Sequence, residues 1–441
     1  MWNRLLLLKA QLLGHEGIRR YGANTAWLMG EKVLRMFMGL FVGIWVARYL
    51  GPEQFGLLSY AQSFVFLFTA IATLGLDSIV VRELVKDNSQ RNVLLGTAFS
   101  LKLIGSLCML PLLWLGVQFT SNDSYTNLLI FIIASGTIFQ SFNVIDFYYQ
   151  SSVLSKYVAF ANTITLAISS IVKIVLILNE ASLLAFAIVG VFDTVILSLG
   201  LIYFYWQRTH HSLREWQFDK VVAKRLLADS WPLLIGGLCF VTFSNIDMVM
   251  LKQFTSEKQT GLYSAAYKLT NLWYFLPGLL LSSLAPALIN VKNDPVNYDS
   301  RLGLLTSFLF WIAFTIALFT TIFSKYIVLV TYGNQYKEAA NIVVILIWVN
   351  VFIYLNSSWN YSKIIQGKEY SILYFHSLAA ILNIISNILL IPKYGAYGAS
   401  VSIIMALLIT MLLFSIFDLD MRKIIKTVFT LGIIKNDKKI F

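Results

Sequence analysis

Long apolar runs recur along the 441-residue chain, and the short connections between them carry most of its charged residues. A helix that crosses a bilayer needs about 20 consecutive, mostly apolar residues, whereas a barrel strand needs only about 9–11. Backbone polar groups in lipid must be satisfied within the segment, so runs of this length must be helices. Apolar residues make up 58% of the chain and charged residues 13%, unlike a soluble domain. The sequence therefore predicts an all-α membrane protein and excludes a soluble enzyme.

About twelve runs reach the spanning length. The predicted spans are 24–47, 55–76, 93–115, 127–149, 157–178, 183–205, 230–251, 261–284, 302–323, 341–361, 370–391 and 396–417. We predict two six-helix lobes at 24–205 and 230–417, with a linker at 206–229 between them. Residues 1–23 form the N-terminal segment and residues 418–441 a basic tail.

The distribution of Lys and Arg predicts the orientation. Positively charged short loops stay in the cytoplasm, and about 23 cations lie on the side shared by both termini against about six on the other. Both termini, the linker and the tail are therefore predicted to be cytoplasmic. The cations are spread through many short loops and do not form one surface, so nucleic acid is not an expected partner.

A weak internal repeat at an offset of 205 residues relates the two halves. The sequence FGLLSYA pairs Gly56 and Ser59 with Gly261 and Ser264 of TGLYSAA. Both segments follow a span and a turn. Six spans per half would place the halves in parallel orientation about an axis along the membrane normal, with a substrate path between the two bundles.

Five cations fall inside predicted spans, where an ionisable side chain usually faces a polar interior and has a function. They are Lys32, Arg35, Lys102, Lys173 and Lys268. At 1.5 Å per residue, Lys32 lies roughly 12 Å and Arg35 roughly 16 Å into the first span, on one helix face. We predict that all five bind an anionic substrate. The alternatives are an ion pair of Arg35 with Glu31 at i,i+4, and lysine stems that reach the membrane surface.

Two intramembrane acids are candidates for ion coupling. Asp193 is the deepest acid of the first half, and Asp247 is the corresponding candidate in the second. Either carboxyl could carry H⁺ or Na⁺, or it could neutralise one of the five cations. No catalytic residue, metal site or cofactor is predicted. The sequence also lacks the phosphate-binding loop G-x-x-x-x-G-K-[ST], so ATP hydrolysis is not an expected energy source.

Four motifs occur in order along the chain. They are ARYLGPEQFGLLS (47–59), DFYYQ (146–150) with Lys156 and Tyr157, NIDMVML (245–251) with GLYSAAYKL (261–269), and NIISNILLIPKYGAYGAS (383–400). With these motifs the chain resembles the polysaccharide or O-antigen flippases of bacterial inner membranes, within the multidrug/oligosaccharidyl-lipid/polysaccharide exporter superfamily.

The resemblance implies a V-shaped pair of lobes whose central cavity opens alternately to the cytoplasm and the periplasm. It implies a cargo of undecaprenyl-pyrophosphate-linked sugar repeat units, moved through the inner membrane toward the periplasm for O-antigen or other surface polysaccharide. Membrane lipids, a polysaccharide polymerase and a chain-length regulator are the implied partners. The family's motifs assign no role to Lys32 or Arg35, whose candidacy depends on their depth and charge.

Two other functions stay open. An ion-coupled multidrug antiporter of the same superfamily would have this architecture but would favour acids in its cavity. A membrane glycosyltransferase or polymerase would act on the same lipid-linked donor. Such an enzyme generally needs a large outer loop, and the longest one predicted here, 324–340, has about 17 residues and one acid, Glu338.

Overall fold

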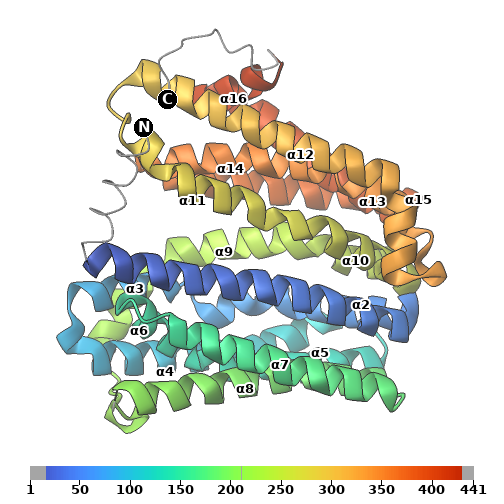
Figure 1. The fold of residues 1–441 in the computed structure, drawn as a ribbon. Coiled ribbons are helices and arrows are strands. Elements are labelled where there is room, and N and C mark those ends of the chain that lie inside the picture. Colours follow the sequence, from blue (N-terminus) through green and yellow to red (C-terminus); the bar gives the residue numbers. More distant parts are fainter. Residues whose placement is uncertain (1–15, 210, 430–441) are drawn as a thin grey trace. The chain divides into compact units, whose positions relative to one another are not determined.

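The computed structural model describes residues 16–209 and 211–429. Within these ranges every regular element is a helix (Figure 1). The prediction of an all-α fold is confirmed. Residues 1–15 of the predicted N-terminal segment and residues 430–441 of the predicted tail lie outside the described residues.

The described ranges contain fifteen α-helices, joined by short turns. Those of the first half are α2 (Glu16–Thr73), α3 (Asp77–Lys86), α4 (Arg91–Gln118), α5 (Ser124–Phe139), α6 (Val144–Ser151), α7 (Lys156–Leu178) and α8 (Leu183–Thr209). Those of the second half are α9 (Lys220–Phe254), α10 (Glu257–Asn271), α11 (Phe275–Ile289), α12 (Pro295–Tyr332), α13 (Ala339–Leu346), α14 (Val349–Gln366), α15 (Glu369–Phe417) and α16 (Leu419–Phe429).

Every predicted span falls on helical segments, and the fourth, eighth and tenth spans each cross a break between two helices. Two long helices carry two spans each and bend between them: α2 at Gly51 (φ 70°) and α15 at Gly395 (φ 55°). A left-handed φ is open to glycine without strain, so each bend falls at a glycine. The eighth span is broken by the 3₁₀ turn η4 (Leu272–Tyr274). Nine helices of the described ranges are therefore long and apolar enough to cross a membrane.

Helix ends differ from the predicted spans because the helices continue beyond the predicted span ends. The expected outer loop 324–340 is helical as far as Tyr332, the end of α12. In the predicted linker, α8 continues to Thr209 and α9 begins at Lys220. In the predicted tail, α16 (Leu419–Phe429) is a further helix. Polar helix ends need no apolar run, so hydropathy does not detect them.

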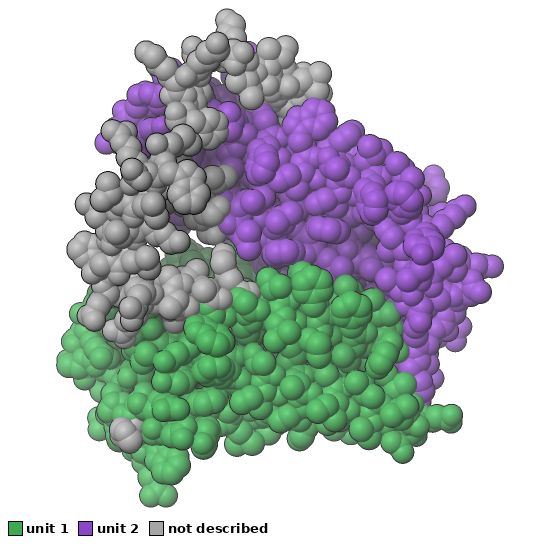
Figure 2. All heavy atoms as spheres, viewed as in Figure 1, with its two compact units in different colours: residues 1–46, 64–238 green, residues 47–63, 239–441 purple. Residues whose placement is uncertain are grey.

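The chain forms two compact units (Figure 2). One contains residues 1–46 and 64–238, and the other residues 47–63 and 239–441. The predicted lobe boundaries stay a prediction, because the units follow packing and not the order of the spans.

Hydrogen bonds hold the segment 47–63 inside the second unit. The Tyr336 hydroxyl donates to the carbonyl of Ala47 (2.8 Å), and the Gln335 amide donates to the carbonyl of Arg48 (2.6 Å). The Arg48 guanidinium in turn donates to the carbonyl of Val330 at 2.5 Å. The backbone of the bend at Gly51 therefore finds its partners on α12 and the turn η5 (Asn334–Tyr336).

The residues related by the 205-residue repeat touch one another. The Ser264 hydroxyl donates to the Ser59 hydroxyl at 2.7 Å. A Cβ atom added to Gly261 would lie 1.8 Å from the Pro52 carbonyl oxygen and 3.1 Å from the Gly56 nitrogen. Small residues let two helix backbones approach closely in a membrane protein. The repeat is therefore a packing motif in which α2 and α10 meet through glycine and serine.

We expect Gly261→Ala to destabilise the protein by about 1–3 kcal/mol, because the added methyl group has no space beside the Pro52 carbonyl. Gly278→Ala is the control, since a Cβ there meets nothing within 4 Å. The measurement is the midpoint of thermal unfolding of the detergent-solubilised proteins. Equal midpoints for the two variants would show that the close contact does not contribute to stability.

Candidate functional site

The first predicted cation pair lies on α2. The Arg35 Nε donates to Glu31 Oε1 at 2.7 Å, and its terminal nitrogen contacts the same oxygen. Glu31 is buried, whereas half of the Arg35 side chain is exposed. Lys32 is exposed and makes no ion pair with another described residue. The structure therefore contains the Glu31–Arg35 pair, which was the alternative to anion binding by Arg35, and gives Lys32 no acidic partner among the described residues.

Lys102 is neutralised within the first unit. Its Nζ lies 3.0 Å from Asp77 Oδ1 and 4.7 Å from the centre of the Phe147 ring. The lysine is buried, with only 3% of its side chain exposed. One contact thus combines a carboxylate from α3, a cation from α4 and an aromatic face from α6. Neither partner was anticipated, because their separation along the chain follows no helical period.

Lys173 and Asp193 form one ion pair between α7 and α8. The Lys173 Nζ donates to Asp193 Oδ2 at 3.0 Å and to the Ser169 hydroxyl at 2.7 Å. About a quarter of each charged side chain is exposed. The structure thus joins a predicted substrate cation to a predicted coupling acid. Neutralisation of a cation was the alternative for Asp193, whereas the alternative for Lys173 was a stem that reaches the membrane surface.

Lys268 lies on α10 in the second unit. Its Nζ is 4.3 Å from the centre of the Phe55 ring, a cation–π distance. Lys268 is half-buried. Of the five predicted cations, Lys32 and Arg35 lie on one helix, and Lys102 and Arg35 both act electrostatically on Asp146. The structure gives an acidic partner to Arg35, Lys102 and Lys173.

Asp247 on α9 is in a different environment. It is buried, with 3% exposed, and accepts hydrogen bonds from the Tyr263 hydroxyl (2.9 Å) and the Asn387 amide (2.6 Å). The same amide donates to Asn383 Oδ1 at 3.3 Å. The Asn387 Oδ1 and the Asn383 Nδ2 are buried with no hydrogen-bond partner among described residues. No ion pair of the described ranges includes Asp247.

A buried carboxylate with no cation is costly, so this group is stable when it binds a proton or a small cation. Its neighbours suit both states. A hydroxyl and an amide donate to the charged form, and amide oxygens are ligands for hard cations. Asn383 and Asn387 were not predicted as site residues, although they lie in a quoted motif. Their i,i+4 spacing, which puts two amides on one helix face, was the signal available.

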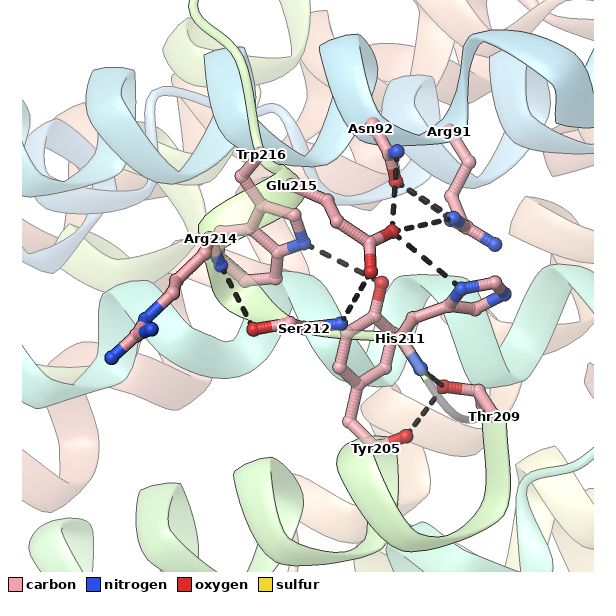
Figure 3. Close-up of polar contacts among 9 residues, drawn as sticks. All are labelled: Arg91, Asn92, Tyr205, Thr209, His211, Ser212, Arg214, Glu215 and Trp216. Carbon is pink, nitrogen blue, oxygen red and sulfur yellow. Dashed lines mark hydrogen bonds and ion pairs between the residues drawn. The ribbon is translucent and has the colours of Figure 1, made fainter.

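A second polar cluster surrounds Glu215 in the first unit (Figure 3). The Glu215 carboxylate accepts from the backbone N–H of Ser212 at 2.9 Å and from the Asn92 amide at 3.4 Å. The Arg91 guanidinium lies 3.5 Å away and His211 Nδ1 3.6 Å away. The hydrogen bond from the Ser212 backbone is the main reason that the pKa of Glu215 lies below its ordinary value of 4.5. The carboxylate thus connects the turn η3 (Leu213–Glu215) to α4.

Backbone contacts continue this connection toward α9. The Gln217 N–H donates to the Asn92 carbonyl at 3.1 Å, and the Asp219 N–H donates to the Thr97 hydroxyl at 3.0 Å. A Cβ at Gly96 would lie 2.5 Å from the Gln217 backbone. The segment between α8 and α9 is therefore fixed on α4.

We expect Glu215→Gln to raise hydrogen exchange at Gln217 several-fold at neutral pH, because the neutral amide loses charge-assisted contacts. The lowered pKa means that the contribution of Glu215 is present above pH 4.5 and is lost as pH falls through its folded pKa. The variant and the native protein should therefore converge in acid. Arg214→Gln is the control, since that side chain points away from the cluster in Figure 3. Identical exchange in both variants at neutral pH would exclude the role.

Among the described residues, no group of three or more His, Cys, Asp or Glu side chains could hold a metal ion.

A sequence search of curated proteins finds no match.

The fold is shared with solved transporters. A multidrug resistance MATE family transporter of the MOP superfamily, in an inward-facing conformation, superposes with a TM-score of 0.68 at 13% identity, over 90% of this chain and 94% of the other. The lipid II flippase MurJ, in an inward closed conformation, gives a TM-score of 0.67 at 17% identity, over 92% of each chain. At this identity the likeness shows the fold alone, a helical fold of the kind that these two proteins have. The long apolar helices of the described ranges indicate a multi-pass membrane protein.

The sequence match is more specific than the fold. The family described as polysaccharide biosynthesis protein matches residues 21–292, more than half of the chain. This agrees with the ordered motifs of the sequence, and the chain belongs to the polysaccharide biosynthesis protein family.

Proposed function

We propose that this protein is a flippase that moves undecaprenyl-pyrophosphate-linked oligosaccharide repeat units from the cytoplasmic to the periplasmic leaflet of a bacterial inner membrane. The repeat units would serve the synthesis of O-antigen or another surface polysaccharide. The observation that carries the proposal is membership of a polysaccharide biosynthesis family by a chain with a transporter fold. A structural neighbour named as a lipid II flippase supports a lipid-linked glycan as cargo.

Alternating access is the mechanism that we propose, with an anionic cargo bound by cations of the spans. Lys32 supports an anionic cargo, because it is a cation within an apolar helix and no described acid neutralises it. Arg35 shares its helix face but is bound to Glu31. A pyrophosphate could compete with Glu31 for the guanidinium, since Arg binds phosphate and carboxylate oxygens with the same planar fork.

Ion coupling is proposed at Asp247 and not at Asp193. Asp193 is neutralised by Lys173, so the binding of H⁺ or Na⁺ to Asp193 would break an ion pair. Asp247 has hydrogen-bond donors but no cationic partner among the described residues, and within the same ranges the buried Asn387 Oδ1 beside it has no hydrogen-bond partner. The carboxyl can thus exchange H⁺ or Na⁺ without breaking an ion pair.

A multidrug antiporter of the same superfamily is the second candidate. The buried, uncompensated Asp247 and the MATE fold favour it. Efflux of cationic dyes from cells that express the protein, with no restoration of surface polysaccharide, would favour the antiporter over the flippase.

We expect Lys32→Ala and Arg35→Ala each to reduce surface polysaccharide about tenfold in a strain that lacks its own flippase, because each removes one charge-assisted contact to phosphate. Arg35→Lys should keep part of the activity. Lys337→Ala, an exposed cation outside the predicted spans, is the control. Glu31→Gln separates the roles of Arg35: it should keep transport if Arg35 binds cargo and should match Arg35→Ala if the ion pair alone is needed. Native polysaccharide from both alanine variants at normal expression would contradict cargo binding by these cations.

We expect Asp247→Asn to transport without dependence on an imposed H⁺ or Na⁺ gradient, because the amide mimics the neutral carboxyl. Asp193→Asn should keep the gradient dependence and lower the amount of folded protein, because Lys173 loses its partner. The measurement is transport in proteoliposomes with each gradient imposed separately, which also identifies the ion. Full gradient dependence in Asp247→Asn would remove this residue from coupling.

A further inference from the structure

The motif DFYYQ with Lys156 and Tyr157 has no part in the proposed transport site. It covers the end of α6, the turn to α7 and the first residues of α7. In the turn, Val153 has a φ of 56°, a left-handed conformation that β-branched residues rarely adopt. Strained turns of this kind persist where the surrounding structure holds them, often at binding sites. The residues after this turn are therefore worth testing for a ligand.

Two cations lie over a single aromatic ring at this place. The Lys156 Nζ is 4.9 Å and the Arg208 Cζ 5.5 Å from the centre of the Tyr157 ring. Lys156 opens α7 and Arg208 lies near the end of α8, and these two helices pack along each other (Figure 1). Within the described ranges neither cation makes an ion pair.

Two other cations of the same unit that lie near an aromatic ring are neutralised. Arg91 contacts Glu215 and Lys102 contacts Asp77, so each has a carboxylate. Two like charges beside one ring repel each other, and a cation–π contact at an exposed site offsets only about 0.5–1 kcal/mol. An anion between the two cations would remove the repulsion.

A buried hydroxyl adjoins the ring. Tyr149 is fully buried, and its hydroxyl has no hydrogen-bond partner among the described residues. Its ring centre is 5.6 Å from that of Tyr157. The α7 N-terminus has no side-chain cap, since Ser155 makes no capping hydrogen bond. Helix N-termini favour anions, which adds to the two cations.

Exposed aromatic side chains at this end of the helices fit a position at the level of lipid headgroups. Trp206 is 65%, Tyr203 51% and Trp27 50% exposed. The Trp27 ring packs on Phe160 with centres 5.1 Å apart. Trp and Tyr gather where a bilayer meets water, and Lys and Arg beside them bind anionic headgroups. By the Lys and Arg count, this is the cytoplasmic surface.

We propose that Lys156 and Arg208, positioned by Tyr157, bind the phosphate of a lipid headgroup at the cytoplasmic surface of the first unit. The Arg guanidinium can grip two phosphate oxygens while the Lys ammonium acts as a point charge. The lipid is either an anionic phospholipid or the pyrophosphate carrier of the cargo. Binding of the carrier lipid rests on the proposed flippase function, whereas binding of a phospholipid does not. A protein that fails to transport could therefore still bind phospholipid at this site.

The test is lipid binding to the full-length protein in neutral detergent, measured by native mass spectrometry. One arm uses phosphatidylglycerol, the second undecaprenyl pyrophosphate, and dioleoylglycerol serves as the lipid without phosphate. We expect Lys156→Ala/Arg208→Ala to weaken binding about tenfold or more in at least one phosphate arm, because charge-assisted contacts are lost. The arm that responds identifies the lipid.

The matched control is Lys220→Ala/Lys224→Ala, which removes two exposed charges from the start of α9 in the same unit. It should bind both lipids as the native protein does. Lys156→Arg/Arg208→Lys keeps both charges and should retain binding, which separates a lost site from a misfolded protein. Equal binding by the alanine variant and the control in both phosphate arms would overturn the proposal. This holds whether the two variants bind like the native protein or are weakened to the same extent.

Discussion

A charge buried among membrane-spanning helices costs a few kcal/mol unless a partner neutralises it, and this constraint organises the polar interior of the protein. In the first unit Lys102 is matched by Asp77 and Lys173 by Asp193, each at 3.0 Å. In both pairs the cation and the acid come from different helices. Each pair therefore neutralises two charges and also connects two helices.

In the second unit the buried acid Asp247 is stabilised by neutral hydrogen-bond donors and not by a cation of the described residues. Asp247 is surrounded by Tyr263 and Asn387, which donate hydrogen bonds but bring no positive charge. Such an environment stabilises a carboxylate less than an ion pair does, so protonation or cation binding becomes the compensating event. An acid of this kind can change charge during a transport cycle without disrupting the helix packing. The two intramembrane acids thus differ in what they can do, although both are single carboxyls in apolar helices.

Much of the fold follows from apolar run length, and every predicted span falls on helical segments. The repeat at 205 residues was also visible, but its meaning was not: Ser59 and Ser264 are hydrogen-bonded to each other. Partners within one helix, such as Glu31 and Arg35, follow from the helical period. Partners from different helices, such as Lys173 and Asp193, do not, because periodicity says nothing about which helices pack together. The amides beside Asp247 were missed because neutral side chains in spans are common.

The central claim is that the protein moves lipid-linked oligosaccharides across a membrane, and reconstitution of the purified full-length chain tests it most directly. Proteoliposomes carry an undecaprenyl-pyrophosphate-linked oligosaccharide in both leaflets, and a glycosidase added outside digests only the outer units. The account predicts that nearly all of the oligosaccharide becomes digestible over time in vesicles with the protein. If digestion stops at the outer-leaflet share, as in protein-free vesicles, the protein is not a flippase for this class of lipid.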